Sequence, residues 1–157
     1  KLNILNSKFN TNSSGSADFT GIPSGNYTAG FTVTNSSHLD ASVDIFDVLA
    51  ILDYTTGSVS PTADQIVAAN VLHDTTDKAS KLDIFDVLRA LDMSTGTVTP
   101  GETVLRDASA SAATYNSDTS AITNYDHTFA ISAGNALTLN AYLLGDVDGD
   151  YAGQISA

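Results

Sequence analysis

The middle of the chain contains one segment twice. Residues 44–61 recur as residues 83–100, and 12 of the 18 aligned positions are identical without a gap. Both copies open with Asp-Ile-Phe-Asp-Val-Leu and close with Thr-Gly-x-Val-x-Pro. Chance does not give identity at this level, so we expect the chain to fold two copies of one structural unit.

Each copy predicts a short amphipathic helix. Asp44 and Asp83 stand at the N-cap position, and an acid follows three residues later in both copies, as in a capping box. The apolar face has helical spacing and comprises Ile45, Val48, Leu49 and Leu52 in the first copy and Ile84, Val87, Leu88 and Leu91 in the second. The Gly and Pro that close each copy favour a left-handed C-cap followed by a helix stop. We expect the two helices to pack against each other.

The flanking segments have the alternating pattern of β-strands. The expected strands are residues 1–10, 27–33, 125–131 and 137–143. The fold class predicted is α+β, mainly β, in a single module of residues 1–157. Strands from about 1–35 and 101–151 form a β-sandwich, and a pair of short helices is inserted at about 36–100.

The connections between these elements are expected from turn-forming residues. Residues 22–26 read as a turn, and residues 132–135 would close a hairpin between the last two strands. Residues 62–70 suggest a further helical turn between the two copies. The Ala/Ser/Thr-rich stretch at 109–120 is expected to be a loop.

The charge balance is strongly acidic and narrows the possible partners. Eighteen acids against six Lys and Arg give a formal net charge of −12, which disfavours binding to nucleic acid or anionic membranes. No apolar run reaches the roughly 20 residues of a membrane span, so no membrane insertion is expected. All the acids except Glu102 are Asp, the residue that is favoured at turns, helix N-caps and calcium loops.

One acidic run has the spacing of a calcium loop. Asp146, Asp148 and Asp150 occupy positions 1, 3 and 5 of an EF-hand-type loop, with Gly149 at position 4. Carboxylates so close together repel one another, and a cation relieves that repulsion. The sequence therefore predicts a Ca²⁺ site here; the alternative is a polar turn after a strand.

The rest of this loop departs from the EF-hand pattern. Position 6 is Tyr151 where Gly is usual, and position 12 would be Ala157, which has no carboxylate. The site therefore needs water or an acid from elsewhere, for which Asp44 or Asp83 at a helix start is a candidate.

The segments that precede the two helices are weaker metal candidates. Their acids are Asp40, Asp44, Asp47, Asp83 and Asp86. Counted as calcium loops that end at the second acid of each helix, neither segment has a full ligand set. The alternative is that these acids only cap helices.

The duplicated helices, each preceded by a partial loop, resemble the dockerin repeat over residues 40–96, as a degenerate member. Residues 65–71 also resemble the stretch before the second dockerin loop, with Asn70 where the family usually has its first Asp ligand. The resemblance implies two calcium loops with helices that dock onto cohesin domains of extracellular bacterial assemblies.

The flanks carry a second resemblance. Residues 19–28, with the pattern Gly, apolar, Pro, small, Gly, x, Tyr, are similar to prealbumin-like β-sandwich modules. Residues 143–151 are similar to the closing strand and loop of secreted bacterial modules that combine such a sandwich with dockerin-like helices. This resemblance implies a secreted or cell-surface location.

The motifs of common catalytic sites are missing from the sequence. It has no Cys, no Gly-x-Ser-x-Gly elbow, no phosphate loop and no His-x-x-x-His zinc pair. We therefore expect a non-catalytic, extracellular calcium-binding structural or protein-interaction module of a larger protein, with a cohesin-like domain as its partner. The alternatives are a self-assembling filament or adhesin subunit joined by strand addition to copies of itself and, third, a carbohydrate-binding module. Sequons at Asn12, Asn26 and Asn35 leave glycosylation open.

Overall fold

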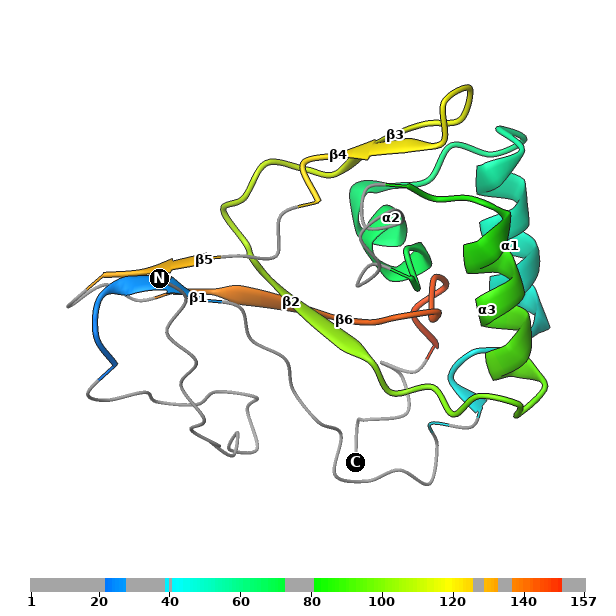
Figure 1. Ribbon diagram of the computed structural model, residues 1–157, viewed down its shortest axis with the longest axis horizontal. Helices are drawn as coiled ribbons and strands as arrows, with labels where there is room; N and C mark the ends of the chain where they lie inside the picture. The colour runs from blue at the N-terminus through cyan, green and yellow to red at the C-terminus, as the bar shows by residue number, and fades with distance from the viewer. Residues whose placement is uncertain are drawn as a thin grey trace.

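The computed structural model describes residues 22–27, 39, 41–72, 81–125, 129–132 and 137–150. In chain order the elements are β1 (Gly25–Tyr27), α1 (Ile45–Thr55), α2 (Ala63–Ala69), α3 (Ile84–Ser94), β2 (Thr103–Asp107), β3 (Thr114–Asn116), β4 (Ala121–Thr123), β5 (Phe129–Ile131) and β6 (Leu139–Leu143). The helices gather at one end, and paired strands extend away from them (Figure 1). The mixed α+β class is confirmed.

The two duplicated helices begin at the predicted N-caps. The Asp44 side chain accepts a hydrogen bond from the backbone of Phe46, and the Asp47 carboxylate accepts one of 2.9 Å from the backbone N–H of Asp44. Asp83 and Asp86 form the same capping box in α3, where the second bond is also 2.9 Å. Each helix start thus satisfies two backbone donors with its own acids.

The helices α1 and α3 lie side by side and run in opposite directions (Figure 1). Val43, just before α1, and Met93, in the last turn of α3, meet at Gly145: a Cβ built there would be 2.8 Å from Val43 Cγ2 and 3.3 Å from Met93 Sδ. Gly57 and Gly96 follow the two helix ends with φ of +72° and +74°, as the C-cap pattern predicts.

The buried side of each duplicated helix differs from the apolar face expected from the sequence. In α1 the buried apolar residues are Val48, Ile51 and Tyr54, while Ile45 and Leu49 are each about half exposed. The same positions in α3 behave in the same way. Of each predicted face only the Val is buried, because α1 and α3 turn another side to the core.

The helix α2 confirms the predicted helical segment between the copies. Thr62 and Gln65 form its capping box, and its last four residues are buried. Ile66 and Val67 lie in the main core, which joins the three helices to side chains from the strands, among them Val104 of β2 and Ile122 of β4.

The described strands form three antiparallel two-stranded ribbons with the pairings β1–β5, β2–β6 and β3–β4. The hairpin expected between the last two strands is wrong: β5 pairs with β1, and β6 pairs with β2 from Thr103↔Leu143 to Asp107↔Leu139. Alternation identifies a strand but not its partner, because any strand with a complementary face can pair with it. These ribbons do not by themselves establish the predicted sandwich.

Two of the expected connections are also corrected. The predicted loop at 109–120 contains β3, and the Asn116 side chain accepts hydrogen bonds from the backbone N–H groups of Asp118 and Thr119 to form the turn toward β4. The predicted turn at 22–26 overlaps the start of β1 at Gly25. Strands of only three residues have a weak sequence signal, and their pairing partners decide their state.

Several predictions fall outside the described residues. These are the strand at 1–10, most of the strand at 27–33 and residues 133–135 of the hairpin turn predicted at 132–135. Within the described part of the chain, none of the helices has both the length and the apolar character that crossing a membrane requires.

Candidate functional site

The acidic segment that follows β6 is held against the helices by backbone hydrogen bonds. Leu144 extends the β2–β6 ladder with a bond of 2.9 Å from its N–H to the carbonyl of Glu102. The next residue, Gly145, donates to the carbonyl of Ala68 at 2.8 Å. Gly145 adopts φ +98°, so it takes a left-handed conformation where the chain turns beneath Val43. The strand ladder and α2 together therefore place residues 146–150 at the start of α1.

Asp47 joins this segment to α1. Its side chain is 1% exposed, and its Oδ1 accepts bonds of 2.8 Å from the backbone N–H of Val147 and 3.3 Å from that of Asp148. Its Oδ2 accepts the capping-box bond from Asp44. One buried carboxylate thus closes the helix start and anchors a segment from the other end of the described chain.

This junction gathers three carboxylates. Asp47, Asp146 and Asp148 each offer an oxygen, and the three oxygens lie within 4.8 Å of one another. Calcium–oxygen bonds are roughly 2.3–2.6 Å, so two oxygens that share one calcium ion are at most about 5 Å apart. The cluster therefore has the donor type and the spacing that a hard divalent cation requires.

The electrostatics of the cluster favour neutralisation. Burial, followed by repulsion from Asp47, Asp150 and Asp148, raises the pKa of Asp146 to about 7, against a hydrogen bond of 2.8 Å from the N–H of Gly149. Burial also raises the pKa of Asp47, with a smaller contribution from Asp148. At neutral pH the charged cluster is costly, and either a proton or a cation relieves that cost.

The remaining acids of the C-terminal loop and the first helix start lie beside the cluster. Among the described residues, Asp150 is not one of the three carboxylates that converge. Its backbone N–H donates to Asp148 Oδ1 at 3.0 Å, and its pKa is raised by partial burial and then by repulsion from Asp148 and Asp44. Asp44 caps α1 and adds negative charge near Asp150, but the acid that completes the triad is Asp47.

The second helix repeats the anchor without the acidic cluster. Asp86 is fully buried; its Oδ1 accepts a bond of 3.1 Å from the N–H of Leu72, and the backbone of Val71 also bonds to its carboxylate. Residues 70–72 thus take the place that residues 146–148 have in the first copy. Asn70 and Leu72 stand where Asp146 and Asp148 stand, so this copy retains the anchoring Asp and has lost the two other carboxylates.

The other sequence candidates have simpler places. Asp83 caps α3 and bonds to the backbone of Phe85 at 2.9 Å. Asp40 lies outside the described residues. The sequence pattern predicts Asp47 as a metal ligand, but in the loop that precedes its own helix. In the structure Asp47 lies instead with Asp146 and Asp148. The signal that was missed is the parallel between Asn70-Val71-Leu72 and Asp146-Val147-Asp148.

A second feature of the two helices is an apolar stripe on their exposed sides. Ile45, Phe46 and Leu49 of α1 are 50%, 67% and 49% exposed. The matching residues of α3 are similarly exposed, namely Ile84, Phe85, Leu88 and Leu91. Large apolar residues that are exposed on one side of a helix are typical of an interaction site. We call these two sets together the exposed helix stripe.

Acids accompany the exposed helix stripe. Asp53 and Asp92 are exposed and follow Leu49 and Leu88 by four residues, so each lies one turn further along the same helix side. A partner surface that matches the stripe therefore needs apolar side chains with Lys or Arg beside them.

Comparisons with known protein families, with curated proteins and with solved structures gave no match to this chain.

Proposed function

We propose that this chain is a non-catalytic extracellular module in which a calcium ion braces the helix pair and the exposed helix stripe binds a protein partner. One observation carries the proposal. The first turn of α1 supplies Asp47 to the carboxylate cluster and also supplies Ile45 and Phe46 to the stripe. A cation held at the cluster therefore fixes the helix turn that presents part of the docking surface.

Calcium is the cation that the donors favour. The cluster offers carboxylate oxygens only, and calcium completes its six to eight ligands with carbonyl oxygens and water. Asp47, Asp146 and Asp148 would hold the ion, with Asp150 and Asp44 near enough to add negative charge. Extracellular calcium modules often bind at about 10⁻⁴–10⁻³ M, which makes the ion a permanent structural part in that setting.

The partner proposed is a cohesin-like domain, in line with the resemblance of the duplicated helices to dockerin. The exposed helix stripe supports this with two matched apolar patches and an acid beside each. The strand segments, at about 1–35 and 101–151, would form the sandwich that carries the helix pair and links the module to the rest of a secreted protein.

Calcium titration calorimetry of the wild-type chain and a D146N/D148L variant tests the proposed calcium site. These substitutions give the first copy the residues of the second, Asn70 and Leu72, and so preserve shapes that the fold already accepts. We expect one ion for the wild type and none for the variant. Equal calcium binding by both proteins would contradict the assignment.

Surface plasmon resonance against a panel of immobilised cohesin domains, in calcium and in chelator, tests the proposed binding of a partner to the exposed helix stripe. We expect calcium-dependent binding that F46D and F85D each weaken at least tenfold, because a charge replaces an exposed apolar contact. The matched control is S58D, which places a charge on an exposed residue beyond the end of α1. Sedimentation of the free protein addresses self-assembly, the second candidate. Among the described strands β1 and β5 pair only with each other, and the outer edge of such a ribbon can pair with a neighbouring chain.

A further inference from the structure

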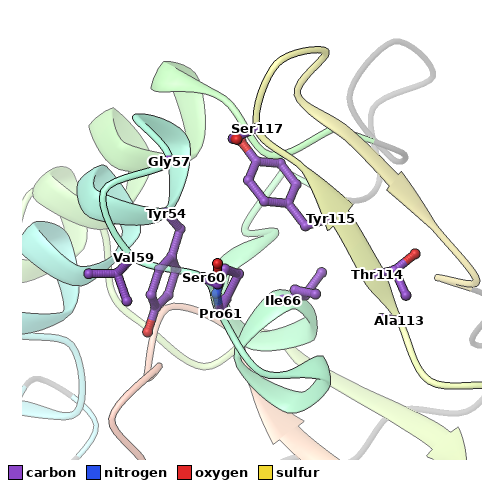
Figure 2. A pocket seen from close by; sticks show the side chains of 10 residues that line it. All are labelled: Tyr54, Gly57, Val59, Ser60, Pro61, Ile66, Ala113, Thr114, Tyr115 and Ser117. Carbon is purple, nitrogen blue, oxygen red and sulfur yellow. The ribbon is translucent and has the colours of Figure 1, made fainter.

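The structure has a pocket that the calcium site and the exposed helix stripe do not use. It lies between the end of α1, the start of α2 and the strand β3, and its volume is about 250 Å³ (Figure 2). Tyr54 and Tyr115 enter it from α1 and β3, and Pro61 and Ile66 lie between those two elements. The walls that carry Tyr54 and Tyr115 therefore come from segments about 60 residues apart in the sequence.

The chemistry of the lining is neutral and mixed. The ring of Tyr115 and the side chains of Val59 and Pro61 supply most of the apolar surface. Tyr54 and Ile66 lie behind them and are only 4% and 3% exposed. The hydroxyls of Ser60 and Ser117 supply groups that both donate and accept hydrogen bonds, whereas that of Thr114 is bonded to the Thr123 hydroxyl. No lining residue is charged. An uncharged lining offers an ionic ligand no partner of opposite charge, which favours a neutral ligand.

The two walls are fixed before any ligand arrives. The Tyr115 hydroxyl donates to the carbonyl of Leu82 at 3.1 Å, which holds its ring in place. Gly57 brings the turn after α1 against Ser117, the residue after β3, since a Cβ at Gly57 would lie 2.9 Å from Ser117 Oγ. A preformed pocket of apolar walls with a few polar groups is the common form of a small-molecule site.

The second copy lacks two features that build this pocket in the first copy. In the second copy Met93 replaces Tyr54, and a Cβ at Gly96 would meet nothing within 4 Å, whereas one at Gly57 would meet Ser117. The same turn therefore lacks both the aromatic ring and the opposite wall. The second copy supplies matched controls for every substitution in the first.

We propose that this pocket binds a single neutral sugar ring, free or at the end of a saccharide chain. A pyranose has apolar C–H faces that pack on aromatic rings and a rim of hydroxyls that bond to Ser side chains. The pocket volume is just below the roughly 300–1,000 Å³ of typical ligand sites, which suits one ring and not several. A small neutral ligand with these contacts binds at about millimolar affinity.

Two-dimensional ¹H–¹⁵N NMR of the full chain tests the proposal. The probes are the methyl glycosides of glucose, galactose, mannose and N-acetylglucosamine and the tetrasaccharides of the same sugars, with glycerol as a polyol control. We expect saturable shifts at the amides of Gly57, Ser60 and Ser117 for at least one sugar and none for glycerol. A tetrasaccharide that binds no tighter than its monomer indicates recognition of one ring, and a gain of tenfold or more would overturn the single-ring assignment.

The variant S60W fills the pocket, and T99W makes the same change at the matching position of the second copy. We expect S60W to abolish the sugar-dependent shifts and T99W to preserve them, while both keep the spectrum of a folded protein. If S60W does not fold, S117A and S60A, which each remove one hydroxyl, should weaken binding at least threefold. Absence of shifts with every sugar at 50 mM (about 50 times a millimolar Kd), or binding that S60W leaves intact, would overturn the proposal.

Discussion

The carboxylate of Asp47 accepts a hydrogen bond of 2.8 Å from the backbone N–H of Val147, a residue 100 positions away in the chain. Asp86, at the same position of the second copy, accepts a bond from Leu72, which corresponds to Asp148 and is only 14 positions away. The duplicated helix thus carries one anchoring acid that can hold either a local or a distant segment. Only the distant segment brings two further carboxylates with it.

The substitution Asp47→Asn is expected to remove the response of the protein to calcium. Asp86→Asn is its matched control, because both residues cap a helix and anchor a segment while only Asp47 belongs to the cluster. Each change replaces an anionic acceptor of backbone donors, so each should lower the free energy of unfolding by about 2 kcal/mol. Thermal unfolding with calcium and with chelator separates the two effects. A calcium-dependent rise in Tm that survives Asp47→Asn would contradict the site.

The substitution Asp146→Asn is expected to stabilise the protein without calcium and to destabilise it, relative to the wild type, with calcium bound. In chelator the variant should be more stable than the wild type at pH 7.5, since ionisation of Asp146 is costly when its pKa is raised to about 7. Asparagine retains an oxygen that can accept the bond from Gly149. At saturating calcium the wild type should be the more stable protein, because the ion binds its carboxylate. Urea unfolding under both conditions measures the difference.

The protein is expected to become less stable as the pH rises, because the buried carboxyl group of Asp86 ionises. Burial raises the pKa of Asp86 from 3.8 to about 6, so the folded state holds a proton that the unfolded chain releases near pH 4. The stabilisation is complete below pH 4 and is lost as pH rises through 6. A pKa raised by about two corresponds to about 3 kcal/mol at most. Urea unfolding in chelator at pH 4.5 and 7.5 should compare D146N with D146N/D86N. The raised pKa of Asp47 contributes to both proteins, so the difference between them isolates the loss due to Asp86.

Alanine is expected to be far less tolerated at Gly145 than at Gly96. Both glycines have positive φ, of +98° and +74°, so both substitutions carry a backbone cost of about 1 kcal/mol. At Gly145 the new Cβ would also lie 2.8 Å from Val43 Cγ2, whereas at Gly96 it meets nothing within 4 Å. We expect a loss of about 2–4 kcal/mol for Gly145→Ala and about 1 kcal/mol for Gly96→Ala. Equal losses in urea unfolding would mean that Val43 moves aside freely.

The exposed helix stripe is expected to contribute little to folding. Phe46 and Phe85 are 67% and 51% exposed, so Phe46→Ser and Phe85→Ser should each change the free energy of unfolding by about 0.5 kcal/mol or less. The buried control is Ile51→Ala, at a fully buried position, with an expected loss of about 2–5 kcal/mol. Binding of the dye ANS should fall in the two Phe variants, because they remove exposed apolar surface. A large loss of stability in either would show that the stripe serves the fold.

Local patterns in the sequence were sufficient for the helical part of the fold. The capping acids, the glycines after the helices and the helical segment at 62–70 all lie where the pattern predicts them. These features depend on hydrogen bonds between residues two to four apart, so the chain encodes them locally. The spacing of Asp146 and Asp148 is also a local pattern, and it predicts two members of the carboxylate cluster.

Tertiary structure decided which side of each helix is buried, which strands pair and which acid completes the cluster. Ile45 and Ile51 are equally apolar, yet one is half exposed and the other fully buried, because the choice depends on where α1 meets α3 and the strands. The strand β6 has the same alternation whether it pairs with β5 or with β2. Asp47 joins Asp146 only because β2 and α2 carry the end of the chain back to the start of α1. Contacts across 100 residues leave no local pattern, so the sequence determined the parts of this site and the packing of the chain assembled them.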